Sequence, residues 1–408
     1  MQHKDSHYDV IIMGAGAAGL SIAQGLLKRQ STLNIAIVDP ADSHFYQPGW
    51  TLVGAGVFSA NETVRPLRPL IPEKVQWIKQ RITRFEPDDN RVRLDNDTFL
   101  EYRALVIAPG LELDWDGIPG LSEALGSYGV TSNYRYDLAP YTWDLVQTLK
   151  RGKALFTQPP MPIKCAGAPQ KAMYLSCDHW LKNHVLPDME VSFHNAGGAL
   201  FGVAAYVPAL MKYVERYGIE LCFNQQLIRV DGPNQQAVFN VTSAEGEVAE
   251  QTQSFDMLHA VPPQRAPEVI RSSTLSNAAG WLDVHPNTLQ HTRFTNIFGA
   301  GDVIGTSNAK TAAAARAQAP IVADNLCSHL AGRVMPGLYQ GYGACPLTVE
   351  RGKVVLAEFG YGGELQPTFP TWLLEGKEPS RLAWHLKANV LPPVYWNLML
   401  KGHEWLTP

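Results

Sequence analysis

The sequence is poor in cysteine, and its five cysteines among 408 residues are too few for a disulfide scaffold. None stands in a Cys-X-X-Cys pair and the nearby histidines lack metal-ligand spacing, so no metal site is expected. No run of about 20 apolar residues could span a bilayer, and no secretory signal is expected at the N-terminus. The formal net charge of −4 argues against nucleic acid as a partner.

A dinucleotide-binding pattern is present in residues 8–39. The apolar run 9–13 predicts a buried strand, 17–28 a helix, and 34–38 a second strand that ends at Asp39. The carboxylate of Asp39 is placed to accept a hydrogen bond from a ribose hydroxyl. Because strand, glycine turn, helix, strand and acid occur in this order, we predict a dinucleotide site rather than a chance glycine turn.

Three glycines in GxGxxG spacing lie between the first strand and the helix. Gly14 permits the tight turn, Gly16 lets the backbone approach a pyrophosphate, and Gly19 lets the helix pack closely on the strand. Backbone N–H groups at Ala17 and Ala18, in the first helical turn, would then point at the phosphates.

Two later segments indicate which dinucleotide binds. Residues 102–110 form an apolar strand pattern that ends in Pro-Gly, and residues 295–303 form a strand pattern followed by Gly-Ala-Gly-Asp. Both resemble signatures of flavin-dependent disulfide reductases, in which the aspartate touches the ribityl chain. A helix is predicted from about Thr311, and its first amides could stabilise negative charge on the flavin ring. The residues expected at FAD from these segments are Pro109, Gly110, Gly301, Asp302 and Ala312.

A nicotinamide fingerprint is missing from the middle of the chain. Residues 153–167 contain a strand pattern, but prolines replace the glycine turn and remove backbone donors that a phosphate would need. The next strand, within 190–198, ends without an acidic residue for a ribose. We therefore expect a second Rossmann-like domain whose electrons do not come from NADH.

One cysteine stands in a position that favours the thiolate. Cys165 lies just before a predicted helix over 169–181, with Lys164 and Lys171 beside it, and both features lower a thiol pKa. A second candidate, Cys345, is expected in a Gly/Pro loop before the strand Lys353 to Phe359. The other three cysteines are interpreted as packing residues: Cys177, Cys222 and Cys327.

Nearly the whole chain resembles the sulfide:quinone oxidoreductases, especially the mitochondrial-type branch that bacteria also have. The stretches that carry the resemblance are GAGAAG, FYQPGWTLVG, PIKCAGAPQKAMYLS, FGAGD, SNAKTAAA, YGACPLT, LAEFGY and VYWNLMLKG. In that family two cysteines flank the flavin and form a redox-active sulfur bridge, and Cys165 and Cys345 fall on those positions. The third cysteine of other branches is missing from residues 111–135, which implies non-covalent FAD.

The resemblance implies a reaction. Hydrosulfide would attack the bridge, Cys345 would become the persulfide, and Cys165 would leave as a thiolate. A small acceptor (sulfite, glutathione or cyanide) would take the outer sulfur, and FAD would pass two electrons to ubiquinone or another quinone. The resemblance implies further roles near the sulfurs: Lys164 and Lys171 would bind the thiolate and hydrosulfide, and Glu123 would relay protons. It also implies contacts with the flavin by Gln47, with the flavin or quinone by Lys310, and with the adenine by the Ile82 backbone. Phe359 and Tyr361 would contact the quinone.

Ordinary roles remain alternatives at several of these positions. Glu123 fits an exposed helix start, Lys310 a capping or surface position, and Tyr361 a core aromatic on a strand. The two lysines beside Cys165 also fit a solvated surface.

The C-terminal segment, residues 380–406, mixes Trp, Tyr and Leu with basic residues, and Pro392 and Pro393 split it into two short helical pieces. Trp, Tyr and Lys together suit a lipid headgroup boundary. We therefore predict a peripheral, monotopic protein at the bacterial inner membrane, with the face left open. A tail packed on the protein's own core, or a homo-oligomer contact, is the alternative.

The predicted fold is α/β, with two Rossmann-like, three-layer (ββα) domains and a C-terminal membrane-associating region. An FAD-binding domain is expected from residues 1–110 and 280–330, a second Rossmann-like domain from 111–279, and a quinone- and membrane-facing region from 331–408. The alternative functions are a flavocytochrome-type sulfide dehydrogenase and an NADH:quinone oxidoreductase. A non-enzymatic alternative is a flavin-binding sulfur carrier or membrane scaffold.

Overall fold

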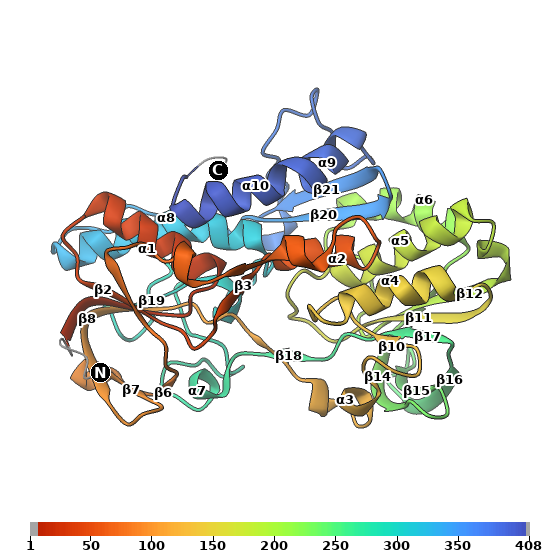
Figure 1. Cartoon of the computed structure of the whole chain (residues 1–408), viewed down its shortest axis with the longest axis horizontal. Helices are drawn as coiled ribbons and strands as arrows, with labels where there is room; N and C mark the ends of the chain where they lie inside the picture. The colour runs from red at the N-terminus through yellow and green to blue at the C-terminus, as the bar shows by residue number, and fades with distance from the viewer. Residues whose placement is uncertain (1–6, 405–408) are drawn as a thin grey trace.

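The computed structural model of the chain describes residues 7–404. Two α/β units lie side by side, and the C-terminal elements run across both of them (Figure 1). The predicted α/β class with two Rossmann-like units is confirmed. No helix among residues 7–404 is long and apolar enough to cross a membrane.

The first unit is built on a sheet in the order β5-β2-β1-β8-β7-β6, with β19 on β8. The strands from β5 to β8, and β19, pair in parallel, and β7 and β6 continue the sheet antiparallel. Its elements are β1 (His7–Met13), α1 (Ala17–Arg29), β2 (Ile35–Val38), β3 (Ser43–Phe45), α2 (Trp50–Val53), β4 (Val64–Pro66), β5 (Val75–Ile78), β6 (Ile82–Glu86), β7 (Arg91–Leu94), β8 (Phe99–Ile107), α7 (Glu268–Arg271), β19 (Ile297–Gly299) and α8 (Ala312–Leu330).

The second unit has three layers. A parallel sheet, β10-β17-β11-β12-β13, lies between the helices α4, α5 and α6 and an antiparallel sheet of β14, β15 and β16 (Figure 1). One apolar core lies on the helix side, around Trp180 and Phe193, and another on the side of the small sheet, around Phe239. The elements are β9 (Glu112–Leu113), α3 (Leu121–Ala124), β10 (Val130–Thr131), α4 (Ala139–Thr148), β11 (Gly152–Gln158), α5 (Ala168–Lys182), β12 (Met189–Asn195), α6 (Val207–Tyr217), β13 (Glu220–Phe223), β14 (Gln225–Asp231), β15 (Gln236–Thr242), β16 (Val248–Ser254), β17 (Met257–His259) and β18 (Gln264–Arg265).

The C-terminal part contains a β-hairpin, β20 (Gly343–Glu350) and β21 (Lys353–Phe359), followed by α9 (Arg381–His385) and α10 (Leu391–Asn397). A π-helical turn, Leu386–Val390, joins the two helices. The two prolines occupy the first turn of α10, where a missing N–H costs nothing. The prediction that Cys345 lies in a loop is wrong, because Gly343–Glu350 pairs along β21.

Much of the C-terminal segment packs on the first unit. Tyr395, Trp396, Met399 and Leu400 are buried in its core, and the Ser21 hydroxyl donates to the Met399 carbonyl at 3.1 Å. These aromatic residues therefore favour the alternative of a tail packed on the protein's own core. Trp405, also part of the predicted membrane segment, lies outside the described residues.

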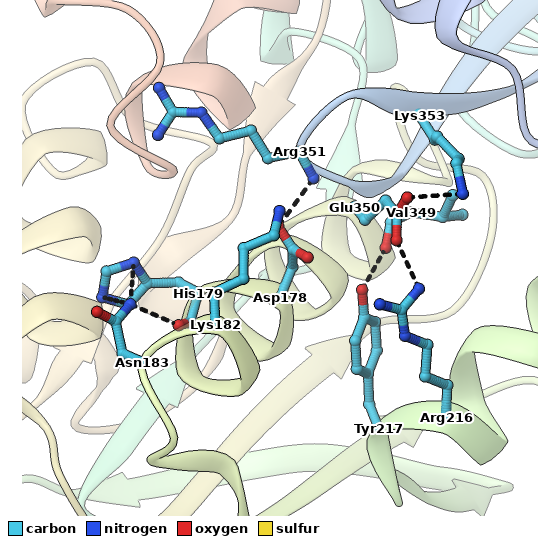
Figure 2. A network of polar contacts seen from close by, with 10 residues as sticks. All are labelled: Asp178, His179, Lys182, Asn183, Arg216, Tyr217, Val349, Glu350, Arg351 and Lys353. Atoms are coloured by element: carbon cyan, nitrogen blue, oxygen red, sulfur yellow. Dashed lines mark hydrogen bonds and ion pairs between the residues drawn. The ribbon is translucent and has the colours of Figure 1, made fainter.

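A polar network fixes the turn of the β20–β21 hairpin to the second unit (Figure 2). The buried Asp178 of α5 accepts hydrogen bonds from the Arg351 N–H at 3.0 Å and from Lys182 Nζ at 2.7 Å. Glu350 forms ion pairs with Arg216 of α6 at 2.6 Å and with Lys353 at 2.9 Å. Because β20 carries Cys345 and α5 follows Cys165, this network fixes two segments that carry the predicted chemistry.

Candidate active site

Cys165 and Cys345 lie together, although they come from distant parts of the chain. The two free thiols are close enough for each to shift the pKa of the other. Cys345 is buried and Cys165 is half-buried. A Cβ atom on Gly167 would lie 2.6 Å from the Cys345 sulfur, so the glycine that follows Cys165 provides the space that the second cysteine occupies.

The backbone at Cys165 is held in an uncommon conformation. Its φ angle is +48°, a left-handed value that few non-glycine residues adopt. The Cys165 N–H donates to the Lys310 carbonyl at 2.8 Å. The Tyr134 hydroxyl donates to the carbonyls of Lys164 at 3.0 Å and Cys165 at 3.2 Å. These bonds fix the thiol at the boundary between the two units.

The charge around the sulfur pair makes the two cysteines unequal. The hydrogen bond from Cys345 and the Lys171 ammonium, 3.1 Å from the Cys165 sulfur, hold the pKa of Cys165 well below its usual range. The same shared hydrogen bond, together with burial, raises the pKa of Cys345. Burial alone would lower the pKa of Lys171, but the two sulfurs outweigh it and raise that pKa. Cys165 is therefore the thiolate of the pair.

A second buried lysine, Lys387, also lines the pocket near the sulfurs. Lys387 was not among the site residues predicted from the sequence. It is 5% exposed, and its Nζ donates to the Pro346 carbonyl at 3.3 Å. Burial and the neighbouring Lys171 lower the pKa of Lys387 to about 7, against the opposing effect of the two sulfurs. The signal in the sequence was a lysine inside an amphipathic segment, which we interpreted as a residue at a membrane surface.

The predicted dinucleotide residues form one pocket wall. A Cβ atom on Gly19 would lie 1.9 Å from the Gly14 oxygen, and one on Gly14 would lie 2.5 Å from the Ala108 oxygen, whereas Gly16 and Gly110 have open space in front of them. Gly14 and Gly19 therefore allow close packing of the backbone, and the open space at Gly16 and Gly110 leaves room for a ligand. The predicted residues that line this pocket are Gly16, Ala17, Ala18, Asp39, Gln47, Pro109, Gly110, Gly301, Asp302, Lys310 and Ala312.

The polar groups of this wall fit FAD. Asp39 accepts the N–H groups of Ala15 at 2.7 Å and Ala41 at 2.8 Å, which fixes its carboxylate at the end of β2. Burial raises the pKa of Asp302, and the ammonium groups of Lys310 and Lys164 oppose that rise. At the start of α8, Thr311 caps the helix by accepting the Ala314 N–H. A helix N-terminus beside a carboxylate is the arrangement expected for the ribityl chain and the flavin ring.

Two lysines lie between this wall and the sulfurs. Lys164 Nζ donates to Gln47 Oε1 at 2.6 Å, and burial lowers its pKa although Asp302 and Cys165 act to raise it. Lys310 Nζ donates to the carbonyls of Asp302 at 2.8 Å and Ile304 at 2.7 Å. Lys310 thus holds the loop of Asp302 in place, and burial lowers its pKa to about 8.

The β20–β21 hairpin separates two environments. Cys345 pairs with Ala357, whereas Ala344 pairs with Glu358 and Pro346 with Leu356. Because side chains alternate along a strand, Cys345 faces the apolar core of the second unit. Ala344, Pro346, Leu356 and Glu358 of the opposite face line a continuation of the flavin pocket toward the π-helical turn and α10. Residues of neighbouring segments complete its lining: Tyr342, Thr368, Phe369, Leu386, Lys387, Leu391, Val394 and Tyr395.

Seven of the predicted residues do not line the pocket. Gly14 and Gly19 pack in the tight turn, and Cys345 faces the core of the second unit. The other four are Phe359, Tyr361, Ile82 and Glu123. Phe359 lies on the same face of β21 as Ala357 and contacts Phe201 edge to face, with ring centroids 5.9 Å apart. The Tyr361 hydroxyl donates to the Pro286 carbonyl at 2.7 Å. Ile82 is buried at the start of β6, and Glu123 is exposed on α3. These four residues therefore do not line the pocket, and the predicted adenine contact of the Ile82 backbone stays a prediction.

The chain is similar to known proteins in both sequence and fold. Residues 8–158 match the family described as pyridine nucleotide-disulphide oxidoreductase. A mouse protein named mitochondrial sulfide:quinone oxidoreductase is 40% identical over 98% of this chain and 87% of its own length. A Dictyostelium discoideum protein of the same name is 39% identical over 96% and 86%. The crystal structure of the sulfide:quinone oxidoreductase from Aquifex aeolicus superposes with a TM-score of 0.80 at 17% identity, over 98% of this chain and 92% of that one.

Proposed function

The chain belongs to the sulfide:quinone oxidoreductase family, and from this premise we propose that Cys165 and Cys345 are the sulfur pair through which it oxidises sulfide. The protein is a flavin-dependent enzyme of this family, with FAD as its cofactor. The observation that carries the proposal is the position of both sulfurs against one segment: Lys171 Nζ lies 3.1 Å from the Cys165 sulfur, and the Cys345 sulfur occupies the space beside Gly167.

The inequality of the two thiols sets the direction of the first step. Hydrosulfide attacks a bridge between two sulfurs, and the sulfur with the lower pKa leaves faster. Because the pKa of Cys165 is lowered and that of Cys345 is raised, attack falls on the Cys345 sulfur. The S–S bond breaks, a new S–S bond forms, Cys345 carries the persulfide with the hydrogen of hydrosulfide, and Cys165 leaves as a thiolate. Lys171 holds that thiolate by charge.

The second half of the cycle restores the bridge. A small nucleophile, for which we propose sulfite, glutathione or cyanide, takes the outer sulfur from Cys345 and leaves a thiolate there. Cys165 and Cys345 then reform their bond and release two electrons. The amides of Ala17 and Ala18, Asp39 and Asp302 would hold FAD, which would supply the two-electron acceptor between the sulfurs and the quinone.

An anaerobic titration with sulfide tests this function. We expect sulfide to bleach the flavin absorbance of the holoenzyme, and a water-soluble ubiquinone analogue to restore it. NADH should leave the absorbance unchanged, because Pro159 and Pro160 follow β11 where a phosphate-binding glycine turn would stand, and β12 ends at Asn195 rather than at an acid. A holoenzyme that sulfide does not bleach would contradict the proposal, and bleaching by NADH would favour an NADH:quinone oxidoreductase. Recovery with cytochrome c but not with the quinone would favour a sulfide dehydrogenase.

We propose that the loop before α9, rather than α10, makes the main contact with a membrane surface. Two apolar side chains of this loop are exposed, Trp372 at 84% and Leu373 at 49%, and Leu382 of α9 is 48% exposed beside them in the chain. The pocket behind Pro346 and Leu356 is lined by Phe369 of the same loop and extends toward the π-helical turn and α10, so a lipid-dissolved quinone would enter from this side. The relatives at 36–40% identity are named mitochondrial, and the bacterial inner membrane stays a prediction.

Removing the exposed apolar side chains should release the protein from lipid. We expect Trp372→Ser combined with Leu373→Ser to lower binding to phosphatidylcholine–cardiolipin vesicles about tenfold or more in a sedimentation assay, since each large side chain contributes about 1.5–3 kcal/mol when buried. Val248→Ser is the matched control. Val248 is 60% exposed on β16, on the side of the molecule opposite α9 (Figure 1). Equal binding by the double variant and the wild type would rule out this contact.

A further inference from the structure

Glu358 is a buried acid in the pocket wall that the sulfur chemistry does not use. Glu358 is only 5% exposed. Its side chain lines the pocket from β21, on the same face of the strand as Leu356. No lysine, arginine or histidine among residues 7–404 forms an ion pair with it. A buried carboxyl without a cationic partner is costly to the fold, and such groups occur where they serve chemistry.

Hydrogen bonds hold the carboxyl in one orientation. Glu358 Oε1 accepts the Tyr342 hydroxyl at 2.7 Å and also the Thr368 hydroxyl. Glu358 Oε2 accepts the Thr368 N–H at 3.1 Å. The two hydroxyls lie 2.9 Å apart, so the three oxygens form a closed ring of exchangeable hydrogen bonds. All three side chains line the pocket.

This ring connects the pocket with the surface. Thr368 is half-buried, and it belongs to a loop in which Glu364 and Pro367 are exposed. A proton that reaches the Thr368 hydroxyl from water is one hydrogen bond from Glu358 and from Tyr342, and both of these residues face the pocket. The hairpin therefore carries a polar path on the face opposite Cys345.

We propose that Glu358 is the proton donor to the quinone, a role that rests on the proposed function of the enzyme. Reduction of a quinone to its quinol adds two electrons and two protons. The bound flavin would supply both electrons and one proton, and the carboxyl of Glu358 supplies the second proton to the quinone oxygen. Water returns a proton to Glu358 through Thr368. Tyr342 and Thr368 are positioning residues that hold the carboxyl and carry this return.

A purely structural role for Glu358 is the competing explanation, because its carboxyl also fixes the loop at Thr368 and its N–H donates to Tyr206. The two explanations differ in which electron acceptor they affect. A proton donor matters for a quinone, which must be protonated, but not for ferricyanide, which takes up electrons without protons. A loss of structure would lower the rates with both acceptors.

The test is Glu358→Gln in the FAD-loaded holoenzyme, with rapid mixing used to measure each half-reaction. We expect sulfide to bleach the flavin at the wild-type rate, and reoxidation by a ubiquinone analogue to slow by about 100-fold, the usual scale for loss of a general acid. Reoxidation by ferricyanide should stay within about twofold of the wild type. Glu364→Gln, which alters an exposed carboxylate in the same loop, should behave as the wild type with both acceptors.

Two results would overturn the proposal: wild-type reoxidation of Glu358→Gln by quinone, or equal slowing with quinone and ferricyanide. If Glu358→Gln does not retain FAD, Thr368→Val and Tyr342→Phe take its place, since each removes one hydroxyl of the ring and leaves the carboxyl. Either variant should then slow reoxidation by quinone more than reoxidation by ferricyanide. A failure of sulfide to bleach any of these proteins would instead contradict the proposed function itself.

Discussion

Cys165→Ser and Cys345→Ser are each expected to lower steady sulfide:quinone turnover by about 10³-fold or more, the largest effect that the structure predicts for single substitutions. Serine keeps the size of the side chain but cannot form the sulfur bridge that hydrosulfide attacks. Loss of either member removes the whole route, so the two variants and the double variant should be equally inactive. The measurement is the initial rate of quinone reduction with saturating sulfide.

The two single variants should still differ in their reactivity toward an alkylating agent. Cys345→Ser keeps Cys165 beside Lys171, 3.1 Å from its sulfur, so iodoacetamide should label Cys165 quickly at neutral pH. Cys165→Ser leaves Cys345 buried and without the thiol that shares its hydrogen bond, so labelling should be slow. Turnover that survives in either variant would show that the pair is not the route of sulfur.

Cys222→Ser is the matched control for both variants. Cys222 is half-buried in β13, and burial raises its pKa to about 11, so it is a poor nucleophile at neutral pH. It does not line the pocket. We expect this variant to bind FAD and turn over at the wild-type rate.

The local patterns in the sequence predicted much of the first unit and one of the two cysteines of the sulfur pair. GxGxxG spacing and a following acid predicted β1, α1 and β2, because that order places the glycine turn at the pyrophosphate and Asp39 at the ribose of one dinucleotide. Cys165 was recognisable from its two lysines and from the helix that follows it. These signals are local, so neighbours along the chain were enough to predict them.

The rest of the site depends on contacts between distant segments. Pro346 and two glycines favoured a loop around Cys345, but proline is tolerated in a two-stranded ribbon, and β21 supplies the partner. Phe359 was predicted at the quinone, but it lies on the Cys345 face of the hairpin, and the neighbouring Glu358 is the residue that lines the pocket. Trp396 and Tyr395 fitted a membrane boundary by composition, but the core of the first unit covers them.

Lys171→Met should raise the pKa of Cys165 and slow the attack of sulfide. The ammonium of Lys171 is buried at 3.1 Å from the sulfur, and its charge is one of the main causes of the low pKa of that thiol. Each unit by which the pKa rises costs about 1.4 kcal/mol of thiolate stability. We expect flavin bleaching by sulfide to slow by about 100-fold at pH 7, whereas Lys171→Arg, which keeps the charge, should slow it by about tenfold or less.

The pH dependence of Cys165 alkylation shows in which direction the pKa of this thiol moves. A thiol with a lowered pKa is a thiolate above that pKa and loses the charge only as the pH falls through it. Once the sulfur bridge has been reduced, the wild type should therefore be alkylated at Cys165 even at acidic pH. In Lys171→Met the Cys165 thiolate should become protonated at a higher pH than in the wild type. Alkylation rates measured by mass spectrometry across the pH range will show this shift. Lys212→Met, at an exposed lysine of α6, should leave the profile unchanged. A wild-type profile in Lys171→Met would contradict the assigned role.

The charge of Lys387 limits how far the pKa of Cys165 rises in Lys171→Met. Lys171 is one of the causes that lower the pKa of Lys387 to about 7, so removing Lys171 lets Lys387 keep its proton to higher pH. The remaining ammonium then stabilises the Cys165 thiolate in part, because its charge also acts on that thiol. The double variant Lys171→Met/Lys387→Met should therefore shift the alkylation profile further than Lys171→Met alone, and Lys387→Met alone should shift it least. Equal shifts in the single and double variants would show that Lys387 does not share the charge on the sulfur pair.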